Sequence, residues 1–237
     1  MKIVFLGDII GSKGIAAIEK FLPVIKYKYP YDFLIVNAEN VTQGKGLCEN
    51  DYYKLISMGI DGITLGNHWF SCPDITNVLN TKSNIIRPYN ITHAVGYGIT
   101  SISKNGRTIV LINLLTTLYM DKKVTNPFLS ITEILKYNNL KKNNLQCILI
   151  DLHGTSTYEK KAFGYFCDGK VSCIVGTHTH VQTSDNCILP RGTGFHSDVG
   201  MCGDKNSCAG SDTYPAIKFF CNDDCFICDD YVKPQVV

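Results

Sequence analysis

The stretch that decides the fold lies at residues 172–186 and reads SCIVGTHTHVQTSDN. An apolar run reaches Gly176 and is followed by His178 and His180, two residues apart. A short apolar run bounded by glycine predicts a buried strand. A strand that ends in two alternating imidazoles directs attention to the residues that end the other strands.

Four further apolar runs predict strands of the same kind, and helical patterns separate them. The five predicted strands cover residues 2–7, 33–37, 62–65, 147–152 and 171–176. Strands that alternate with helices predict an α/β fold with a mainly parallel sheet covered on both faces. Asn105 and Gly106 stand between two β-rich runs and predict an added β-hairpin.

Helices are predicted around residues 15–25, 52–56 and 127–137. Pro23 is expected to kink or break the first of them, because proline removes one hydrogen bond of a helix. Asn50 or Asp51 is expected to cap the second helix, and Gly59 stands just past its end.

The bulk composition is that of an ordinary globular protein. The chain has 237 residues, 45% hydrophobic and 19% charged, with a formal net charge of +2. This charge gives no reason to expect a nucleic-acid or membrane partner, and the apolar runs are too short to span a bilayer. The first residues, MKIVFLGDIIG, predict a core strand rather than a signal peptide, so a cytoplasmic protein is expected.

The chain holds eleven cysteines. An odd number without a secretion signal argues against a disulfide framework. Cys221, Cys225 and Cys228 have a spacing that could hold a zinc ion or an iron–sulfur cluster. The favoured alternative is a chain that is simply rich in cysteine.

Each predicted strand is followed by polar side chains of the kind that bind metals. These residues are Asp8, Glu39, Asn40, Asn67, His68, His153, His178 and His180. In an open α/β sheet, ligands bind outside the carboxyl ends of the strands, so five strands deliver these groups to one edge. Alone, each residue would be better explained as a helix cap, a turn former or a satisfied histidine.

The types of donor limit the metal. Carboxylate, amide oxygen and imidazole suit Mn, Fe or Zn, and seven candidates without His68 exceed what one ion takes from a protein. Two-metal hydrolytic sites hold their ions about 3.5–4 Å apart. Residues two apart on a strand face the same way, so His178 is expected to serve one ion and His180 the other, with Glu39 bridging. His68 is expected to point elsewhere, toward the substrate, where it would protonate a leaving oxygen.

The motifs GD, NAEN, GNH and GTHTH, in this order, resemble those of the calcineurin-like metallophosphoesterases. The longer stretches MKIVFLGDIIGSKG, NAENVTQGKG and DGITLGNHWF look like the YmdB-type branch, bacterial cytosolic phosphodiesterases active on 2′,3′-cyclic nucleotides. The resemblance implies a four-layer α/β/β/α sandwich with a metal site at the C-terminal ends of the strands. It also implies a homo-oligomer.

The resemblance further implies the ligand sets and the reaction. Asp8, Glu39, Asn40 and His180 would surround one ion, and Glu39, Asn67, His153 and His178 the other. The two divalent or trivalent ions would be Fe or Mn, with Zn or Mg as alternatives. A metal-bridging hydroxide would attack the phosphorus of a small phosphodiester, with His68 as the proton donor.

Two stretches depart from the family. Gly154 and Thr155 replace an Ala-Glu pair, which concerns the substrate contacts. The second departure is the cysteine-rich tail: the domain is expected to cover residues 1–205, followed by a cysteine-rich appendage at 206–237.

Two alternative functions stay open. They are a phosphomonoesterase with the same metal core and a regulatory protein of low turnover that binds metal or nucleotide. His93 and His196 are expected to bind no metal, while Asp198 could orient a ligand or stabilise a turn.

Overall fold

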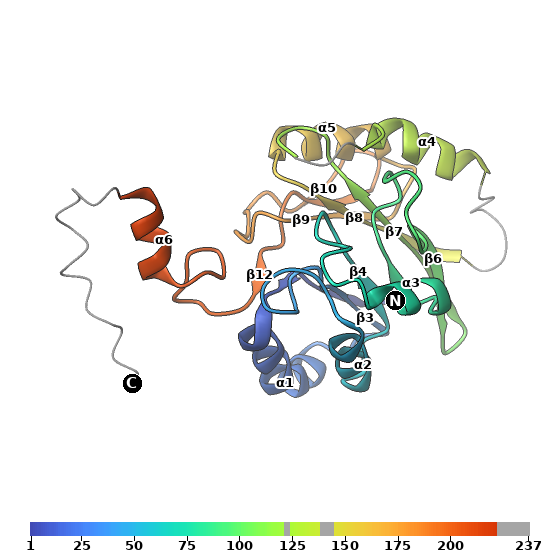
Figure 1. Cartoon of the computed structure of the whole chain (residues 1–237). Coiled ribbons are helices and arrows are strands. Elements are labelled where there is room, and N and C mark those ends of the chain that lie inside the picture. Colours follow the sequence, from blue (N-terminus) through green and yellow to red (C-terminus); the bar gives the residue numbers. More distant parts are fainter. Residues whose placement is uncertain (121–123, 138–144, 222–237) are drawn as a thin grey trace.

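The computed structural model describes residues 1–120, 124–137 and 145–221. Two β-sheets face each other, and helices cover the outer face of each (Figure 1). The first sheet is parallel, with the order β1 (Ile3–Leu6), β3 (Phe33–Asn37), β4 (Gly62–Thr64), β5 (Ile85–Ile86). The second sheet has the order β10 (Cys187–Ile188), β11 (Gly194–His196), β9 (Cys173–Thr177), β8 (Leu145–His153), β7 (Arg107–Leu115), β6 (Ile99–Lys104).

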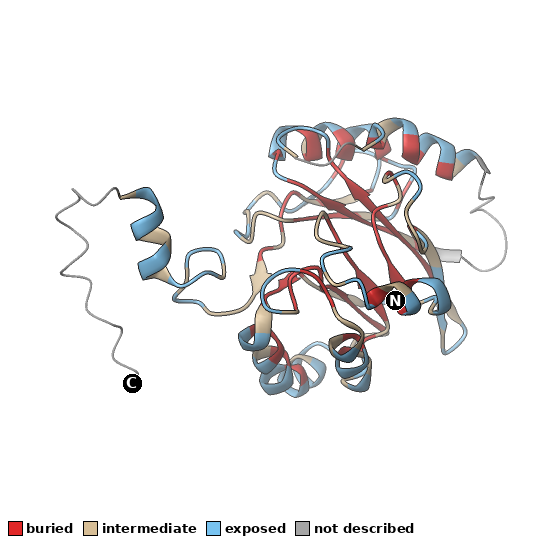
Figure 2. Ribbon diagram, viewed as in Figure 1, coloured by how far each residue is buried: buried red, intermediate tan, exposed pale blue. Residues whose placement is uncertain are grey.

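The described residues form three apolar layers. Helices α1 (Gly11–Lys28), α2 (Glu49–Ser57) and α3 (Ile75–Thr81) pack on the first sheet, and α4 (Pro127–Tyr137) and α5 (Thr157–Cys167) on the second. The third layer fills the space between the sheets, as the buried interior in Figure 2 shows. The four-layer α/β/β/α sandwich is therefore confirmed. The mainly parallel sheet covered on both faces is present as well, but a second sheet, which the strand pattern did not predict, covers one of its faces.

Strand β3 shows why one sheet was expected. Its alternate residues Leu34 and Val36 face the helices, while Phe33 and Ile35 face the other sheet. All five residues of β3 are buried. A strand buried on both faces is apolar throughout, whether a helix or a second sheet covers it.

Two local expectations need correction. Helix α1 is not broken at Pro23 but continues to Lys28, because Pro23 and Glu19 are exposed and the carbonyl left without a partner can face water, while a kink at Pro23 stays a prediction. Helix α2 is capped by Cys48, whose Sγ accepts a hydrogen bond from the Asp51 backbone N–H at 3.4 Å.

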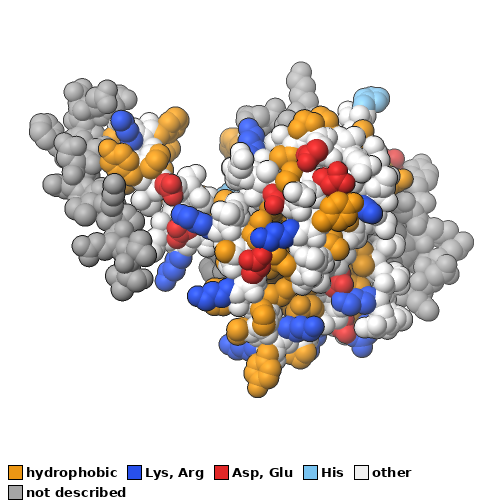
Figure 3. Space-filling view, turned by 60° about the horizontal axis from the view of Figure 1, so that its bottom comes forward, with side chains coloured by type: hydrophobic (Ala, Val, Ile, Leu, Met, Phe, Trp, Pro, Cys, Tyr) orange, Lys and Arg blue, Asp and Glu red, His pale blue; other side chains and the backbone are white. Residues whose placement is uncertain are grey.

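Other expectations are confirmed. Gly59 follows α2 with φ +87°, and Asn105 and Gly106, with φ +52° and +73°, form the turn between antiparallel β6 and β7. Both positive φ values fit the type I′ turn that hairpins prefer. Lysines, arginines and acidic side chains are interspersed on the face shown in Figure 3, as the small net charge suggests. Among the described helices none combines the length and the hydrophobicity that crossing a membrane requires.

The last described segment leaves the sandwich. Strand β12 (Met201–Cys202) pairs in parallel with β2 (Asp8–Ile9), and the chain then leads to α6 (Thr213–Phe220). Helix α6 lies apart from the two sheets in Figure 1 and has no buried residue. The nine described cysteines form no disulfide, and Cys225 and Cys228 of the possible metal cluster lie outside the described residues.

Candidate metal centre

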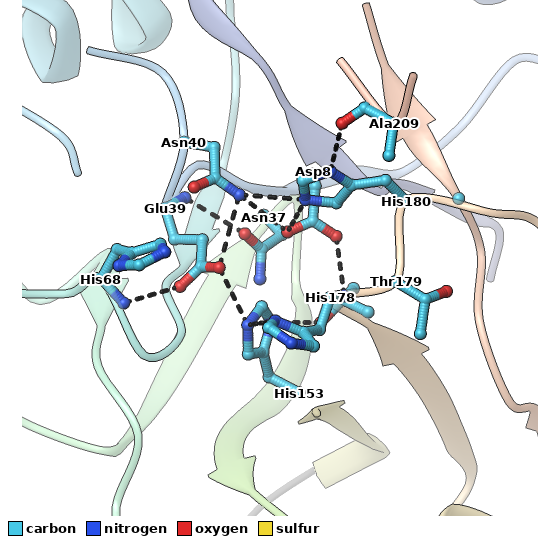
Figure 4. A network of polar contacts seen from close by, with 12 residues as sticks. Asp8, Asn37, Glu39, Asn40, His68, His153, His178, Thr179, His180 and Ala209 are labelled. Carbon is cyan, nitrogen blue, oxygen red and sulfur yellow. Dashed lines mark hydrogen bonds and ion pairs between the residues drawn. The ribbon is translucent and has the colours of Figure 1, made fainter. Parts of the chain in front are cut away.

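The structure brings all seven expected ligands together, and Figure 4 labels each of them except Asn67. Asp8 lies in β2, Glu39 and Asn40 follow β3, Asn67 follows β4, His153 ends β8, and His178 and His180 follow β9. Because the strands that carry them run parallel within each sheet, their carboxyl ends meet where the two sheets face each other.

Four of these residues form what we call the inner half of the centre: Glu39, Asn67, His153 and His178. Nε2 of His153 lies 2.9 Å from Oε1 of Glu39, 2.9 Å from Oδ1 of Asn67 and 3.0 Å from Nδ1 of His178. The ligand atoms of Glu39, His153 and His178 all lie within 4.8 Å of one another. Two nitrogens and two oxygens therefore face one small volume, which is a donor set suited to a transition-metal ion or zinc.

Asp8, Asn40 and His180 form the outer half of the centre. Nδ2 of Asn40 lies 3.5 Å from Oδ1 of Asp8, 3.3 Å from Oε1 of Glu39 and 3.2 Å from Nε2 of His180. Nε2 of His180 lies 3.7 Å from Oδ1 of Asp8. Glu39 contacts both halves, which is the position expected of a bridging carboxylate.

Gly66 tests whether the inner half has room for an ion. A Cβ atom at this position would lie 2.2 Å from Oε2 of Glu39 and 2.4 Å from Nε2 of His153. The φ of Gly66 is not positive, so space rather than backbone freedom requires a glycine here. The residues thus leave an open position between their donor atoms, and they fit a metal ion.

The backbone of the two histidines differs from what we expected. Strand β9 ends at Thr177, and His178 and His180 have φ +101° and +63°, so they belong to a turn and not to the strand. The expectation that strand geometry directs them was wrong, although one lies in each half. Positive φ is uncommon outside glycine and is costly, so the surrounding contacts must hold this turn in place.

Electrostatics favour a cation here. Burial alone would raise the pKa of Asp8 and Glu39, but hydrogen bonds and charges of His180 and His153 outweigh burial and lower both values. Burial opposes charging of His153, yet the carboxylates of Glu39 and Asp8 raise its pKa to about 9. Burial and the charge of His153 lower the pKa of His178 to about 4. In the metal-free centre His153 therefore carries a proton. A bound cation would take the place of this positive charge beside the same carboxylates.

The tautomer of His180 follows from its partner. Its Nδ1 lies 2.8 Å from the backbone carbonyl oxygen of Ala209, which can only accept a hydrogen bond. Nδ1 therefore carries the proton, and in the neutral ring the lone pair of Nε2 faces Asp8. The segment that leads to α6 thus orients a ligand of the outer half.

His68 lies at the rim of the inner half and is partly buried. Its backbone N–H donates to Oε2 of Glu39 at 3.0 Å, and its Nε2 lies 3.4 Å from Nδ2 of Asn67. The two neighbouring side chains therefore come close together, although we expected them to point in different directions. Contact with a substrate stays a prediction.

Two buried carboxylates lie beneath the ligands: Asp198, for which the sequence left open a role in orienting a ligand or in stabilising a turn, and Asp151, which was not considered. Asp198 accepts hydrogen bonds from the buried ammonium of Lys160 and from the backbone N–H of Thr179, both at 3.1 Å. It holds the turn between the two histidines and contacts neither ring. The signal for Asp151, a carboxylate inside the apolar run CILIDLH, was visible in the sequence but was not used.

The structure explains why this chain has Gly154 where the family more often has alanine. A Cβ atom on Gly154 would lie 1.8 Å from Oγ1 of the buried Thr116, so this chain needs glycine beside that threonine. The hydroxyl of Thr155 donates to the backbone carbonyl of Tyr119 at 3.2 Å, on an exposed loop. His196 bonds to the carbonyl of Thr183 and takes no part in the centre.

The chain is similar in sequence and in structure to several known proteins. A family model described as YmdB-like protein matches residues 4–225. The 2′,3′-cyclic-nucleotide 2′-phosphodiesterase of Bacillus subtilis strain 168 is 40% identical over 221 residues, which cover 93% of this chain and 82% of that protein. A crystal structure described as a novel phosphatase from Mycoplasma pneumoniae is 39% identical with a TM-score of 0.85, covering 93% of this chain and 79% of that chain.

A more distant structure bears on the fold alone. The crystal structure of 5′-nucleotidase from Candida albicans SC5314 is 17% identical with a TM-score of 0.55, covering 84% of this chain and 46% of that chain. The similarity confirms the expected calcineurin-like architecture. At this identity it carries no argument about activity.

Proposed function

The chain belongs to the YmdB-like protein family, and from this premise we propose that it is a two-metal phosphodiesterase that hydrolyses 2′,3′-cyclic nucleotides. The observation that carries the proposal is the convergence of seven donor side chains in two halves that share one of them, Glu39. The phosphodiesterase and the phosphatase among its relatives agree with the activity expected from the sequence.

The two halves would each hold one ion. Glu39, Asn67, His153 and His178 would hold the inner one, and Asp8, Asn40 and His180 the outer one with Glu39. Asn40 would bind through its amide oxygen, which requires the two ends of its amide to exchange relative to the contacts described above. When bound, such ions, Fe or Mn by preference, supply Lewis acidity toward phosphate oxygens and lower the pKa of water.

The side chains have further tasks in the reaction. The carboxylate of Glu39 would offset the repulsion between two cations, and the backbone N–H of His68 holds that carboxylate in place. We assign proton donation to the imidazole of His68, because an alkoxide that leaves a cyclic diester needs a proton and imidazole can supply one near neutral pH. Asn67, a residue of the inner half, contacts both His153 and this donor.

The test is hydrolysis of 2′,3′-cyclic AMP and bis-p-nitrophenyl phosphate by metal-stripped protein, before and after Mn²⁺ or Fe²⁺ is added. We expect turnover only with metal, and we expect His68→Ala to lower kcat by about 10²–10⁴ with the bound metal retained. The matched control is His93→Ala, which removes a histidine outside the centre. Two bound ions without turnover of either diester would favour the regulatory alternative, and faster hydrolysis of p-nitrophenyl phosphate would favour the phosphomonoesterase.

Two further proposals concern the cellular compartment and the oligomeric state of the protein. We propose that it works in the cytoplasm and forms homo-oligomers, as expected from the resemblance of its motifs. Light scattering on the eluate of a sizing column measures the mass of the assembly. A mass of 26.3 kDa, that of one chain, would contradict the second proposal.

A further inference from the structure

A buried carboxylate, whose hydrogen bonds go to residues other than the ligands, lies beneath the inner half. Asp151, in β8, accepts hydrogen bonds from Oγ1 of Thr177 at 2.6 Å, Oγ1 of Thr64 at 2.5 Å and Nδ2 of Asn37 at 2.9 Å. These four residues are fully buried. Three donors surround one acceptor in the dry space between the sheets, where such bonds are strong and an unmatched group is costly.

The hydroxyl of Thr177 transmits the effect of this carboxylate to a ligand. It has one hydrogen, and that hydrogen is donated to Oδ1 of Asp151. Toward Nδ1 of His153, 2.8 Å away, the hydroxyl can therefore only accept. Nδ1 must carry a proton, and Nε2 is the atom of His153 that faces Glu39 and the other donors of the inner half.

Asn37 extends the same network to a second ligand. Its Nδ2 donates to Asp151, and its Oδ1 accepts from the backbone N–H of Glu39 at 3.1 Å. Asn37 ends β3 of the first sheet and Glu39 follows that strand, whereas Asp151 and His153 lie in β8 of the second sheet. One buried carboxylate thus connects ligands that come from different sheets.

We propose that Asp151 is a positioning residue which, through Thr177, selects Nε2 of His153 as the metal-binding atom and, through Asn37, fixes Glu39 opposite it. The inference rests on the proposed metal centre and extends it to residues that touch neither ion nor substrate. Partners of this kind fix the tautomer and the ring orientation of a ligating histidine, and their loss costs about 10–100-fold in metal affinity.

The experiment compares Thr177→Val with Thr177→Ser in full-length protein. Valine has the shape of threonine but no hydroxyl, whereas serine keeps the hydroxyl, so the pair separates hydrogen bonding from packing. Zn²⁺ affinity is measured by competition with a chromophoric chelator, and circular dichroism confirms that both variants are folded. We expect Thr177→Val to bind the more tightly held of the two Zn²⁺ ions about 10–100-fold more weakly than the wild type does. The affinity of Thr177→Ser for this ion should stay within about threefold of the wild-type value.

A second readout addresses the tautomer directly. In the Zn²⁺-loaded wild type, ¹H–¹⁵N NMR should show a slowly exchanging Nδ1–H on His153, and Asp151→Asn should broaden or remove it. Equal Zn²⁺ affinity of the valine and serine variants, or coordination of zinc by Nδ1 of His153, would overturn the inference. So would a wild type that binds no zinc.

The two claims fail separately. Hydrolysis of 2′,3′-cyclic AMP by the wild type, together with equal zinc affinities of the two Thr177 variants, would leave the proposed function standing and remove the role of Asp151. A clear difference between these variants, in a protein that hydrolyses no diester, would leave the positioning role standing and remove the proposed function.

Discussion

The inner and outer halves of the centre differ in what holds them. In the inner half, His153 and Glu39 are 0% and 1% exposed, and their atoms are held by both sheets through Asp151 and Asn37. In the outer half, His180 is 17% exposed and its ring is oriented by Ala209, on the segment that leads to α6. Asp8 and Asn40 of the outer half are buried as well, so the difference lies in the histidines: the core orients His153 and the periphery orients His180. We therefore expect the inner half to bind its ion more tightly.

The largest effect should follow from closing the inner half. Gly66→Ala would place a Cβ atom 2.2 Å from Oε2 of Glu39, so we expect loss of the inner ion and of diester hydrolysis. Metal content is measured by mass spectrometry of dialysed protein. The control is Gly203→Ala, because a Cβ atom there would have no neighbour closer than 3.7 Å and the φ is not positive. Two ions retained in Gly66→Ala would show that the space between Glu39 and His153 holds no metal.

The next effect concerns the turn that joins the two halves. Lys160 and Asp198 form an ion pair at 3.1 Å with both side chains 0% exposed, so Lys160→Met leaves a buried charge without its partner. We expect the free energy of unfolding to fall by about 3–5 kcal/mol, as measured by urea denaturation. The neighbouring pair of Lys161 and Asp185, 3.8 Å apart and partly exposed, provides the control. Lys161→Met should lower the free energy of unfolding by less than about 1 kcal/mol. Equal losses in both variants would argue against a stabilising role of the buried Lys160–Asp198 pair.

A pH titration separates the halves in a third way. The pKa of His153 is raised to about 9 in the metal-free protein, so at neutral pH a cation must displace its proton. Affinity of the inner half should therefore rise by about tenfold per pH unit up to about pH 9 and then level off. His178, with its pKa lowered to about 4, is already neutral and should add nothing above pH 5. A flat affinity between pH 6 and 8, measured by calorimetry, would contradict the proton on His153.

The smallest effect should come from the ion pairs that attach the segment before α6 to helix α1. Nζ of Lys13 lies 2.9 Å from Oδ2 of Asp204 and 3.5 Å from Oδ1 of Asp212, all on the surface. Lys13→Ala should lower the affinity of the outer half by less than about fivefold and leave the inner half unchanged. Manganese binding at two salt concentrations measures this, with Lys20→Ala as the control on the same helix. An effect on the inner half would mean that the two halves are not held independently.

Much of this could be predicted from the sequence because the signals are local. Each of the eight polar residues comes shortly after a predicted strand in the chain, and the structure brings these residues together. The two-sheet division could not be read from the predicted strands, because β3 is apolar on both faces. The turn at His178 and His180 was missed because positive φ at a non-glycine residue is imposed by distant contacts, such as that with Ala209.

The supports of the centre were the hardest part to predict. Asn37 and Asp151 are 114 residues apart, and nothing near either one marks the other as its partner. Buried polar networks depend on how two sheets are placed against each other, which a single sequence does not specify residue by residue. The tail cysteines Cys225 and Cys228 lie outside the described residues, so the favoured interpretation of a chain simply rich in cysteine stays a prediction, and the metal cluster stays its alternative.

The most direct test of the two-half account is equilibrium dialysis of Mn²⁺ against the wild type, His153→Ala and His180→Ala. We expect two ions per chain in two classes of affinity, with the tighter class lost in His153→Ala and the weaker class lost in His180→Ala. Loss of the tighter class in His180→Ala, with that class retained in His153→Ala, would contradict the account.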